Sequence, residues 1–150
     1  MALTDQIQSD LTGAMKARDS KRTATLRMVL AAIKNQRVAA GQSGDLSDAQ
    51  TLELLAREAK KRAEAATAFR DAGREELADK EEAELAILRT YLPAQLSEAE
   101  LRTLVDEAIA ETGAAEPGDL GRVMSAVMPK TKGRADGKQV NAIVRERLGG

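Results

Sequence analysis

The residues of this chain with types and spacing suited to chemistry are basic ones near its C-terminal end. Five of them fall within seventeen positions: Arg122, Lys130, Lys132, Arg134 and Lys138. Asp136 is the single acid between Leu120 and Glu146. Clustered Lys and Arg side chains can neutralise the phosphates of a nucleic acid, so the stretch predicts an anionic ligand. Basic loop residues are also commonly just solvated, and the residues alone leave both interpretations open.

Other kinds of site lack the residues that they need. The chain has no Cys and no His, which removes disulfides, thiol chemistry, imidazole catalysis and most zinc sites. Gly133, Gly137 and Lys138 have the wrong spacing for a nucleotide P-loop, with three residues between the glycines and Gln139 after the lysine. These glycines are predicted to be turn residues. No catalytic residue, metal or cofactor is predicted.

Two further groups are predicted to be structural. The acidic residues between 75 and 84 could suggest a metal site, but di-iron helical bundles also use a Glu-x-x-His motif. We therefore expect a solvated helix face, with Glu81 as the member able to pair with a basic residue of another helix. Met124 and Met128 are expected in the core, and a peptide-binding groove is the alternative.

Composition predicts an all-α fold. Phe69 and Tyr91 are the only aromatic residues, whereas β-sandwiches and barrels use many aromatic and β-branched side chains. A hydrophobic content of 43% is enough to build a core. No apolar run approaches the length of a membrane span, and the first ten residues lack the pattern of a signal peptide. The sequence thus predicts a soluble cytoplasmic protein without membrane contact.

Four helices are predicted before Pro93, at residues 4–18, 19–40, 47–72 and 74–92. Thr4 is the expected N-cap of the first, and Ser47 with Gln50 has the spacing of a capping box. The apolar stripe of the third helix is rich in alanine. We therefore expect it to pack against the bulkier side chains of the helix at 19–40.

The proline at position 93 is the predicted boundary between subdomains 1–92 and 93–150. The second is expected to hold three helices, at 98–112, from the Asp119 N-cap to a break at Pro129, and from 136 to 148.

The near-neutral total charge of −1 hides an uneven distribution. Residues 121–150 carry seven Lys and Arg against two acids, and residues 93–120 carry one against seven.

The sequence of this last stretch resembles a known family. GRVMSAVMPKTKGRADGKQVNAIVRERL, at 121–148, is similar to the C-terminal motif shared by YqeY proteins and the tail of the GatB subunit of tRNA-dependent amidotransferases. The segments at 26–35, 59–85 and 91–101 also resemble the YqeY pattern. The resemblance implies a multihelical fold, with a four-helix N-terminal subdomain and a three-helix C-terminal subdomain, and a role connected with tRNA. The catalytic core of GatB has no counterpart in this chain.

The basic stretch predicts contacts to an anionic backbone, and the resemblance implies that the ligand is tRNA or other structured RNA, bound by a non-catalytic accessory protein. Its contacts to the phosphate backbone are expected from Arg122, Lys130, Lys132, Arg134 and Lys138. One alternative is a protein-interaction adaptor for an amidotransferase or an aminoacyl-tRNA synthetase, acting through basic residues of the N-terminal helices: Lys21, Arg22, Arg27 and Lys34. Another alternative is an accessory amidotransferase activity, with glutamine as amide donor, which rests on family association alone.

Overall fold

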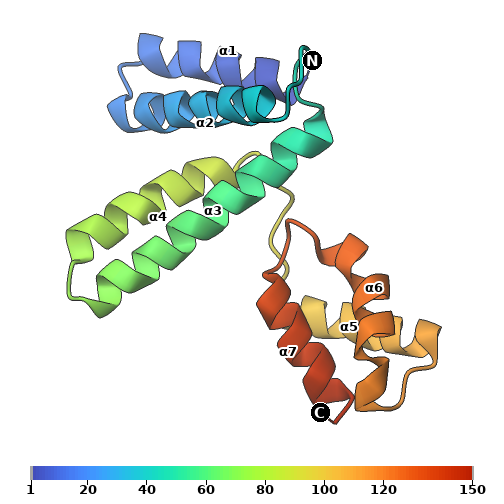
Figure 1. The fold of residues 1–150 in the computed structure, drawn as a ribbon. Coiled ribbons are helices and arrows are strands. Elements are labelled where there is room, and N and C mark those ends of the chain that lie inside the picture. The colour runs from blue at the N-terminus through green and yellow to red at the C-terminus, as the bar shows by residue number, and fades with distance from the viewer. Residues whose placement is uncertain (1, 150) are drawn as a thin grey trace. The chain divides into compact units, whose positions relative to one another are not determined.

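Helices provide all the regular structure in the computed structural model, which describes residues 2–149 (Figure 1). Seven α-helices and one short 3₁₀ helix occur there, and no strand occurs in that range. The prediction of an all-α fold is confirmed. The chain divides into two compact units, Met1–Leu92 and Pro93–Gly150, whose end residues 1 and 150 lie outside the described range. No helix between residues 2 and 149 has both the length and the hydropathy of a membrane span.

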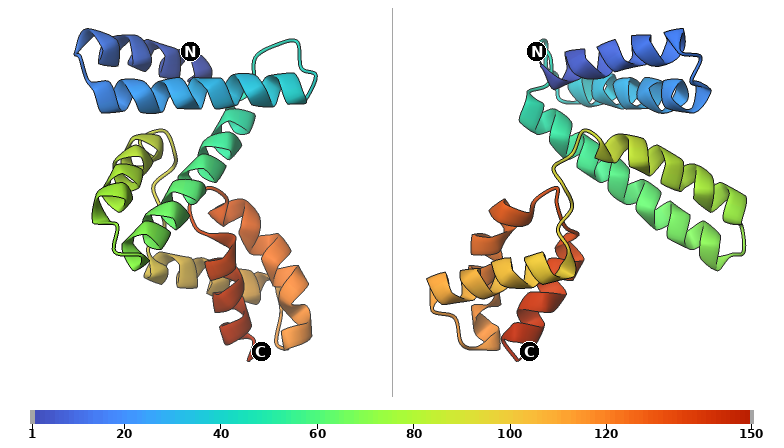
Figure 2. Two further views of the ribbon diagram at one scale, coloured as in Figure 1. Left: turned by 60° about the vertical axis from the view of Figure 1, so that its left-hand side comes forward. Right: turned by 180° about the vertical axis from the view of Figure 1, so that it is seen from behind.

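The first unit consists of two antiparallel helix pairs. Its helices are α1 (Leu3–Lys16), α2 (Ser20–Ala39), α3 (Asp48–Asp71) and α4 (Glu75–Arg89). α1 lies beside α2 and α3 lies beside α4 in every view (Figures 1 and 2). The expectation that α3 packs mainly against α2 is therefore wrong. The short turn at 72–74 folds α4 back along α3, and the buried alanines of this pair, Ala66 and Ala78, allow a close approach.

The core of the first unit lies where the two helix pairs meet. Leu26 of α2, Leu55 of α3 and Leu88 of α4 are fully buried there, together with Ile7 of α1. Beyond this crossing α3 and α4 continue side by side (Figure 1). Arg70 holds their turn through ion pairs with Glu75 at 2.8 Å, Glu82 at 2.9 Å and Asp79 at 3.6 Å.

The N-terminal cap of α3 agrees with the sequence-based prediction, whereas that of α1 does not. The Ser47 side chain accepts from the Gln50 backbone N–H at 3.1 Å, and the Gln50 side chain accepts from Ser47 N–H at 2.9 Å, so the predicted capping box is confirmed. Thr4 is not the N-cap of α1, because the helix begins at Leu3. The Leu3 N–H donates instead to the carboxylate of Asp48, at 2.9 Å. A side chain 45 residues later in the chain thus accepts a hydrogen bond from a backbone N–H that has no partner within its own helix.

The acidic face of α4 is not entirely solvated, because one of its members pairs with a buried arginine. Arg62 of α3 is 8% exposed and donates from Nη1 to Glu58 Oε2 at 2.7 Å, and its Nε lies 3.3 Å from Glu84 Oε2. The interhelical pairing expected of Glu81 is therefore made by Glu84. Burial raises the pKa of the Glu58 carboxyl, but the hydrogen bond from Arg62 and the charges of Lys61 and Arg62 outweigh it and hold that pKa below its usual value.

The C-terminal end of this unit is fastened to its first helix. The Tyr91 hydroxyl donates to Asp10 Oδ2 at 2.5 Å, two residues before Pro93. Burial, followed by the hydrogen bond to Asp10, raises the pKa of Tyr91. Tyr91 therefore stays a neutral donor, and the chain leaves the unit from a fixed point on α1.

The second unit is a three-helix arrangement with a core of its own. It contains α5 (Glu98–Thr112), the 3₁₀ helix η1 (Pro117–Asp119), α6 (Leu120–Thr131) and α7 (Gly137–Arg147). Leu101 and Val105 of α5 are fully buried, as are Val127 of α6 and Val140 of α7. The predicted capping box of Ser97 with Glu100 is present at the start of α5, with both hydrogen bonds at 3.1 Å.

The predicted break at Pro129 is wrong, because α6 continues through it to Thr131. Proline removes one backbone hydrogen bond to the carbonyl four residues earlier, here that of the exposed Ser125. The last turn is held by other bonds. Lys132 N–H donates to the Met128 carbonyl at 2.9 Å, and the buried Thr131 hydroxyl donates to the Val127 carbonyl at 3.3 Å.

The first unit should fold without the second, because no residue after Leu92 belongs to its core. We predict that a fragment of residues 1–92 is helical by circular dichroism and unfolds in one cooperative transition in urea. The complementary fragment 93–150 is the matched case and should be less stable, since small domains bury a smaller fraction of their surface. An unfolded 1–92 fragment would contradict the prediction.

Replacing the buried arginine should destabilise the first unit strongly. Arg62→Ala removes the buried partner of two partly buried carboxylates, Glu58 and Glu84, and leaves only the exposed Lys61 beside Glu58, which costs about 3 kcal/mol of unfolding free energy. Arg57→Ala, on the same helix but exposed and bonded to Gln36 at 3.3 Å, should change it by less than about 0.5 kcal/mol. Urea denaturation of both variants measures this, and equal losses would contradict it.

The loss of stability caused by Arg62→Ala should also depend on pH, and it should be smaller in acid. Since the folded-state pKa of Glu58 lies below its usual value of 4.5, its stabilisation is complete above that value and is lost as the pH falls through the lower one. The stability difference between wild type and Arg62→Ala should accordingly shrink in acid.

Candidate nucleic-acid interface

The connection between α6 and α7 carries the centre of the predicted basic site. Lys132 leaves the helical conformation with φ −56° and ψ 125°, and Gly133 follows with φ +75°. Asp136 is the N-cap of α7 and accepts from the Lys138 N–H at 3.0 Å. The connection is therefore a short, defined turn at 132–136. The prediction that Gly133 is a turn residue is confirmed, whereas the same prediction for Gly137 is wrong, because Gly137 is the first residue of α7.

This connection is fastened to the segment that leads into α5. The Leu96 N–H donates to the Arg134 carbonyl at 2.9 Å, and Arg134 Nε donates to the Ala94 carbonyl at 3.2 Å. The Gln95 side chain donates to the Gly133 carbonyl at 3.1 Å. Arg134 is consequently half-buried, with part of its donor capacity used inside the protein. These bonds join residues 38 to 40 positions apart, so no local sequence signal could have predicted them.

A small cavity of about 260 Å³ lies beside Arg134. Leu96, Glu100, Thr103 and Leu104 of the segment and α5 form its other walls. The backbone hydrogen bond at Ser97 lowers the pKa of the Glu100 carboxyl, and the charge of Arg134 acts in the same direction. Glu100 therefore remains a carboxylate and partly offsets the positive charge of Arg134 at this point.

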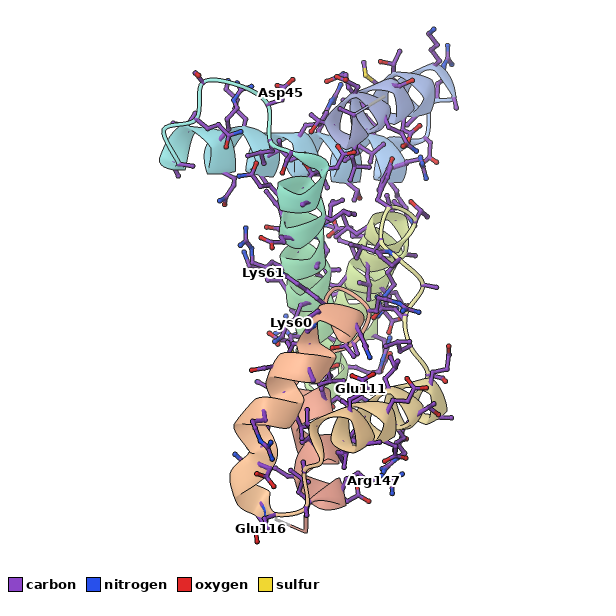
Figure 3. The ribbon with its side chains drawn as sticks, turned by 90° about the vertical axis from the view of Figure 1, so that its right-hand side faces the viewer. Asp45, Lys60, Lys61, Glu111, Glu116 and Arg147 are labelled. Atoms are coloured by element: carbon purple, nitrogen blue, oxygen red, sulfur yellow. The ribbon has the colours of Figure 1, made fainter. Side chains whose placement is uncertain are left out.

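Two of the predicted contact residues form ion pairs within the unit. Lys130 Nζ lies 3.2 Å from Glu111 Oε1 of α5, which Figure 3 labels. Arg122 Nη2 lies 2.9 Å from Asp119 Oδ1, and its Nη1 donates to the Thr112 carbonyl at 3.2 Å. Arg122 is eight residues before Lys130 on α6, or about 12 Å along the helix. The structure thus places Arg122 apart from the residues around the connection.

Asp119 is the N-cap residue of α6, as predicted, but its side chain makes no capping hydrogen bond. Oδ2 instead accepts from the N–H groups of Ala115 and Glu116, at 3.0 and 3.1 Å, and so closes the turn between α5 and α6. These two backbone bonds, followed by the bond from Arg122, lower the pKa of the Asp119 carboxyl.

The exposed cations of α7 are not all paired in this way. Arg147 lies 3.1 Å from Asp106, and Arg102 of α5 bonds Glu146 at 3.2 Å (Figure 3 labels Arg147). Lys138 and Arg145 are exposed, and the described residues place no carboxylate within ion-pair distance of either. Arg145 was not among the predicted site residues. Lys138 and Arg145 are seven residues apart, which places them on one helix face two turns apart, and this spacing could have identified Arg145 from the sequence.

The two methionines differ in their burial. Met124 is half-buried against the core of the second unit, whereas Met128 is 36% exposed. The expectation that Met128 is a core residue is therefore wrong, because the turn beyond it, around Thr131, faces the core in its place.

Among residues 2–149, no group of three or more His, Cys, Asp or Glu side chains could hold a metal ion.

Comparison with known proteins gives one family and two relatives. A family model described as Yqey-like protein matches residues 4–148. The protein named "Altered inheritance of mitochondria protein 41, mitochondrial" from Pyrenophora tritici-repentis is 32% identical over 151 residues, which cover 96% of this chain and 80% of that protein. The protein of the same name from Lachancea thermotolerans is 32% identical over 114 residues, which cover 74% of this chain and 60% of that protein.

These relatives correct one prediction. Both are named as mitochondrial proteins, which contradicts the cytoplasmic location predicted from the sequence. That prediction rested on the absence of cysteines and of a recognisable secretory signal, and neither feature distinguishes one compartment without disulfides from another.

The turn after α6 should depend on its glycine. Gly133→Ala places a Cβ in the left-handed region, at φ +75°, and should lower the unfolding free energy by about 1–2 kcal/mol. Gly137→Ala is the matched control: its Cβ would meet only Met128 Cε, at 3.9 Å, and alanine favours the first turn of α7. Thermal denaturation of both variants tests this, and equal stability of the two would contradict it.

Proposed function

The chain belongs to the YqeY family, and we propose that it is a non-catalytic accessory protein that binds tRNA or another structured RNA. In this proposal its two units act as a four-helix and a three-helix subdomain. The second subdomain contacts the phosphate backbone through the basic connection at 132–136 and the start of α7. The observation that carries the proposal is the fastening of this connection, which holds basic residues at one defined place.

Electrostatics supports this assignment. Lys132, Arg134 and Lys138 lie on or next to a helix N-terminus, where backbone N–H groups and the helix dipole favour negative charge. Arg122 and Lys130 would each have to exchange a carboxylate partner for a phosphate, which reduces the binding energy that each contributes. Contacts of this kind read the backbone and shape of a nucleic acid more than its bases.

The resemblance of 121–148 to the GatB tail is the reason to name tRNA among structured RNAs. An accessory amidotransferase activity would require an activated nucleophile to release ammonia from glutamine. The chain has no His and no Cys for that purpose, and no serine carries a recognisable activating base. We therefore do not propose this activity.

A second candidate function rests on a different surface. A groove of about 470 Å³ lies between α2 and α4 of the first unit. Its lining includes the small residues Ala24, Thr25 and Ala83 and charged residues such as Lys21 and Lys80. Small lining residues leave room for a partner's side chains, so an adaptor role toward an amidotransferase or an aminoacyl-tRNA synthetase would use this groove.

The test of RNA binding is a comparison of salt dependence. A variant with alanine at four positions, Lys130, Lys132, Arg134 and Lys138, should bind tRNA more weakly than wild type. Each lost phosphate contact should flatten the plot of log affinity against log salt concentration by about one unit. The wild-type dissociation constant is expected at about 10⁻⁴ to 10⁻⁶ M, and fluorescence anisotropy at two salt concentrations measures both quantities.

A matched control separates a local site from net charge. It replaces four exposed cations of the first unit with alanine: Lys16, Lys21, Arg27 and Lys34. This control should keep wild-type affinity. Equal affinity of wild type and the first variant would exclude the proposed interface, and equal weakening of both variants would exclude a localised site.

A further inference from the structure

Three polar residues form a stripe along one side of α7, the outer two exposed and the middle one half-buried. Lys138, Asn141 and Arg145 follow one another at spacings of three and four, so they lie on one helix face. From Lys138 to Arg145 the stripe extends about 10 Å along the helix axis. It begins in the first turn of α7, directly after the basic connection, and continues away from it.

A hydrogen bond between two of its members orients the side chains of this stripe. Arg145 Nε donates to Asn141 Oδ1 at 2.7 Å, which fixes the direction of the guanidinium. The two terminal amino groups of Arg145 form the planar fork that suits a phosphate. Asn141 has an amide group that can donate to phosphate or hydroxyl oxygens. A side chain held in place loses less entropy on binding than a free one.

The positive charges of this stripe are not neutralised inside the protein. Its neighbours Arg147 and Arg102 are ion-paired with Asp106 and Glu146, at 3.1 and 3.2 Å. Lys138 and Arg145 have no carboxylate at ion-pair distance among residues 2–149. A phosphate can therefore contact them without first displacing an internal partner, which would cost binding energy.

We infer that the stripe of Lys138, Asn141 and Arg145 binds the backbone of double-helical RNA and extends the contact surface from the connection along α7. Residues 93–150 contain no aromatic side chain. Proteins that hold single strands stack bases on aromatic rings, whereas double-stranded RNA is recognised through its shape, phosphates and 2′-hydroxyls. The second unit has groups only for the latter mode. This inference rests on the proposed RNA-binding function.

The variant Arg145→Ala in the full chain tests the stripe. An RNA duplex titrated by fluorescence anisotropy should bind it about fivefold to tenfold more weakly than wild type at 0.1 M salt, because one phosphate contact is lost. Asn141→Ala should weaken binding in the same direction, since it removes both the amide and the support of Arg145. An unstructured oligouridine of equal length should bind wild type more weakly than the duplex.

Arg147→Ala is the matched control, because it removes the same charge from the same helix at an ion-paired position. It should bind the duplex like wild type, and thermal denaturation should show that all three variants are folded. Equal weakening by Arg145→Ala and Arg147→Ala, or equal binding of oligouridine and duplex, would overturn the inference. Unchanged binding by Arg145→Ala, with loss in the Lys130/Lys132/Arg134/Lys138 variant, would overturn the stripe alone. No binding of any RNA by wild type would overturn the proposed function with it.

Discussion

The hydrogen bond from the Leu96 N–H to the Arg134 carbonyl is the interaction on which the candidate site depends. Together with the bonds of Arg134 to Ala94 and of Gln95 to Gly133, it fixes a five-residue turn against the start of α5. A short loop with no such bonds would sample many conformations, and each contact to a ligand would then cost conformational entropy. Here that entropy is lost when the second unit folds, because the same bonds join the segment before α5 to the connection between α6 and α7.

Internal pairing decides which cations of this unit are available to a ligand. The sequence shows seven basic residues after position 120, and their number alone predicts a strongly positive surface. In the structure, ion pairs reduce the positive charge that these residues present to a ligand. Carboxylates of α5 and the following turn engage Arg122, Lys130 and Arg147, at 2.9 to 3.2 Å. The acidic segment at 93–120 therefore neutralises part of the basic one, and the exposed, unpaired charge lies along α7.

Features that depend on a local interaction were predictable from the sequence. The boxes at Ser47 and Ser97 belong to this group, because their partners lie three residues apart. Features that depend on a distant partner were not predictable, as for Asp48 at the N-terminus of α1 and Glu84 beside Arg62. The continuation of α6 through Pro129 was not predictable either, because the effect of a proline on a helix depends on what holds the following turn, here the burial of Thr131. The fold class and the basic stretch were thus predictable, whereas the fastening of the connection and the free charge on Arg145 were not.

The most direct test of the central claim is to map where RNA contacts the intact chain. A titration of ¹⁵N-labelled protein with tRNA, followed by amide chemical shifts, reports every backbone position at once. We expect the largest chemical-shift changes between Lys132 and Arg145, smaller changes at Arg122 and none along α2. Changes centred on α2 and α4, or no changes at RNA concentrations up to about 10⁻⁴ M, would contradict it.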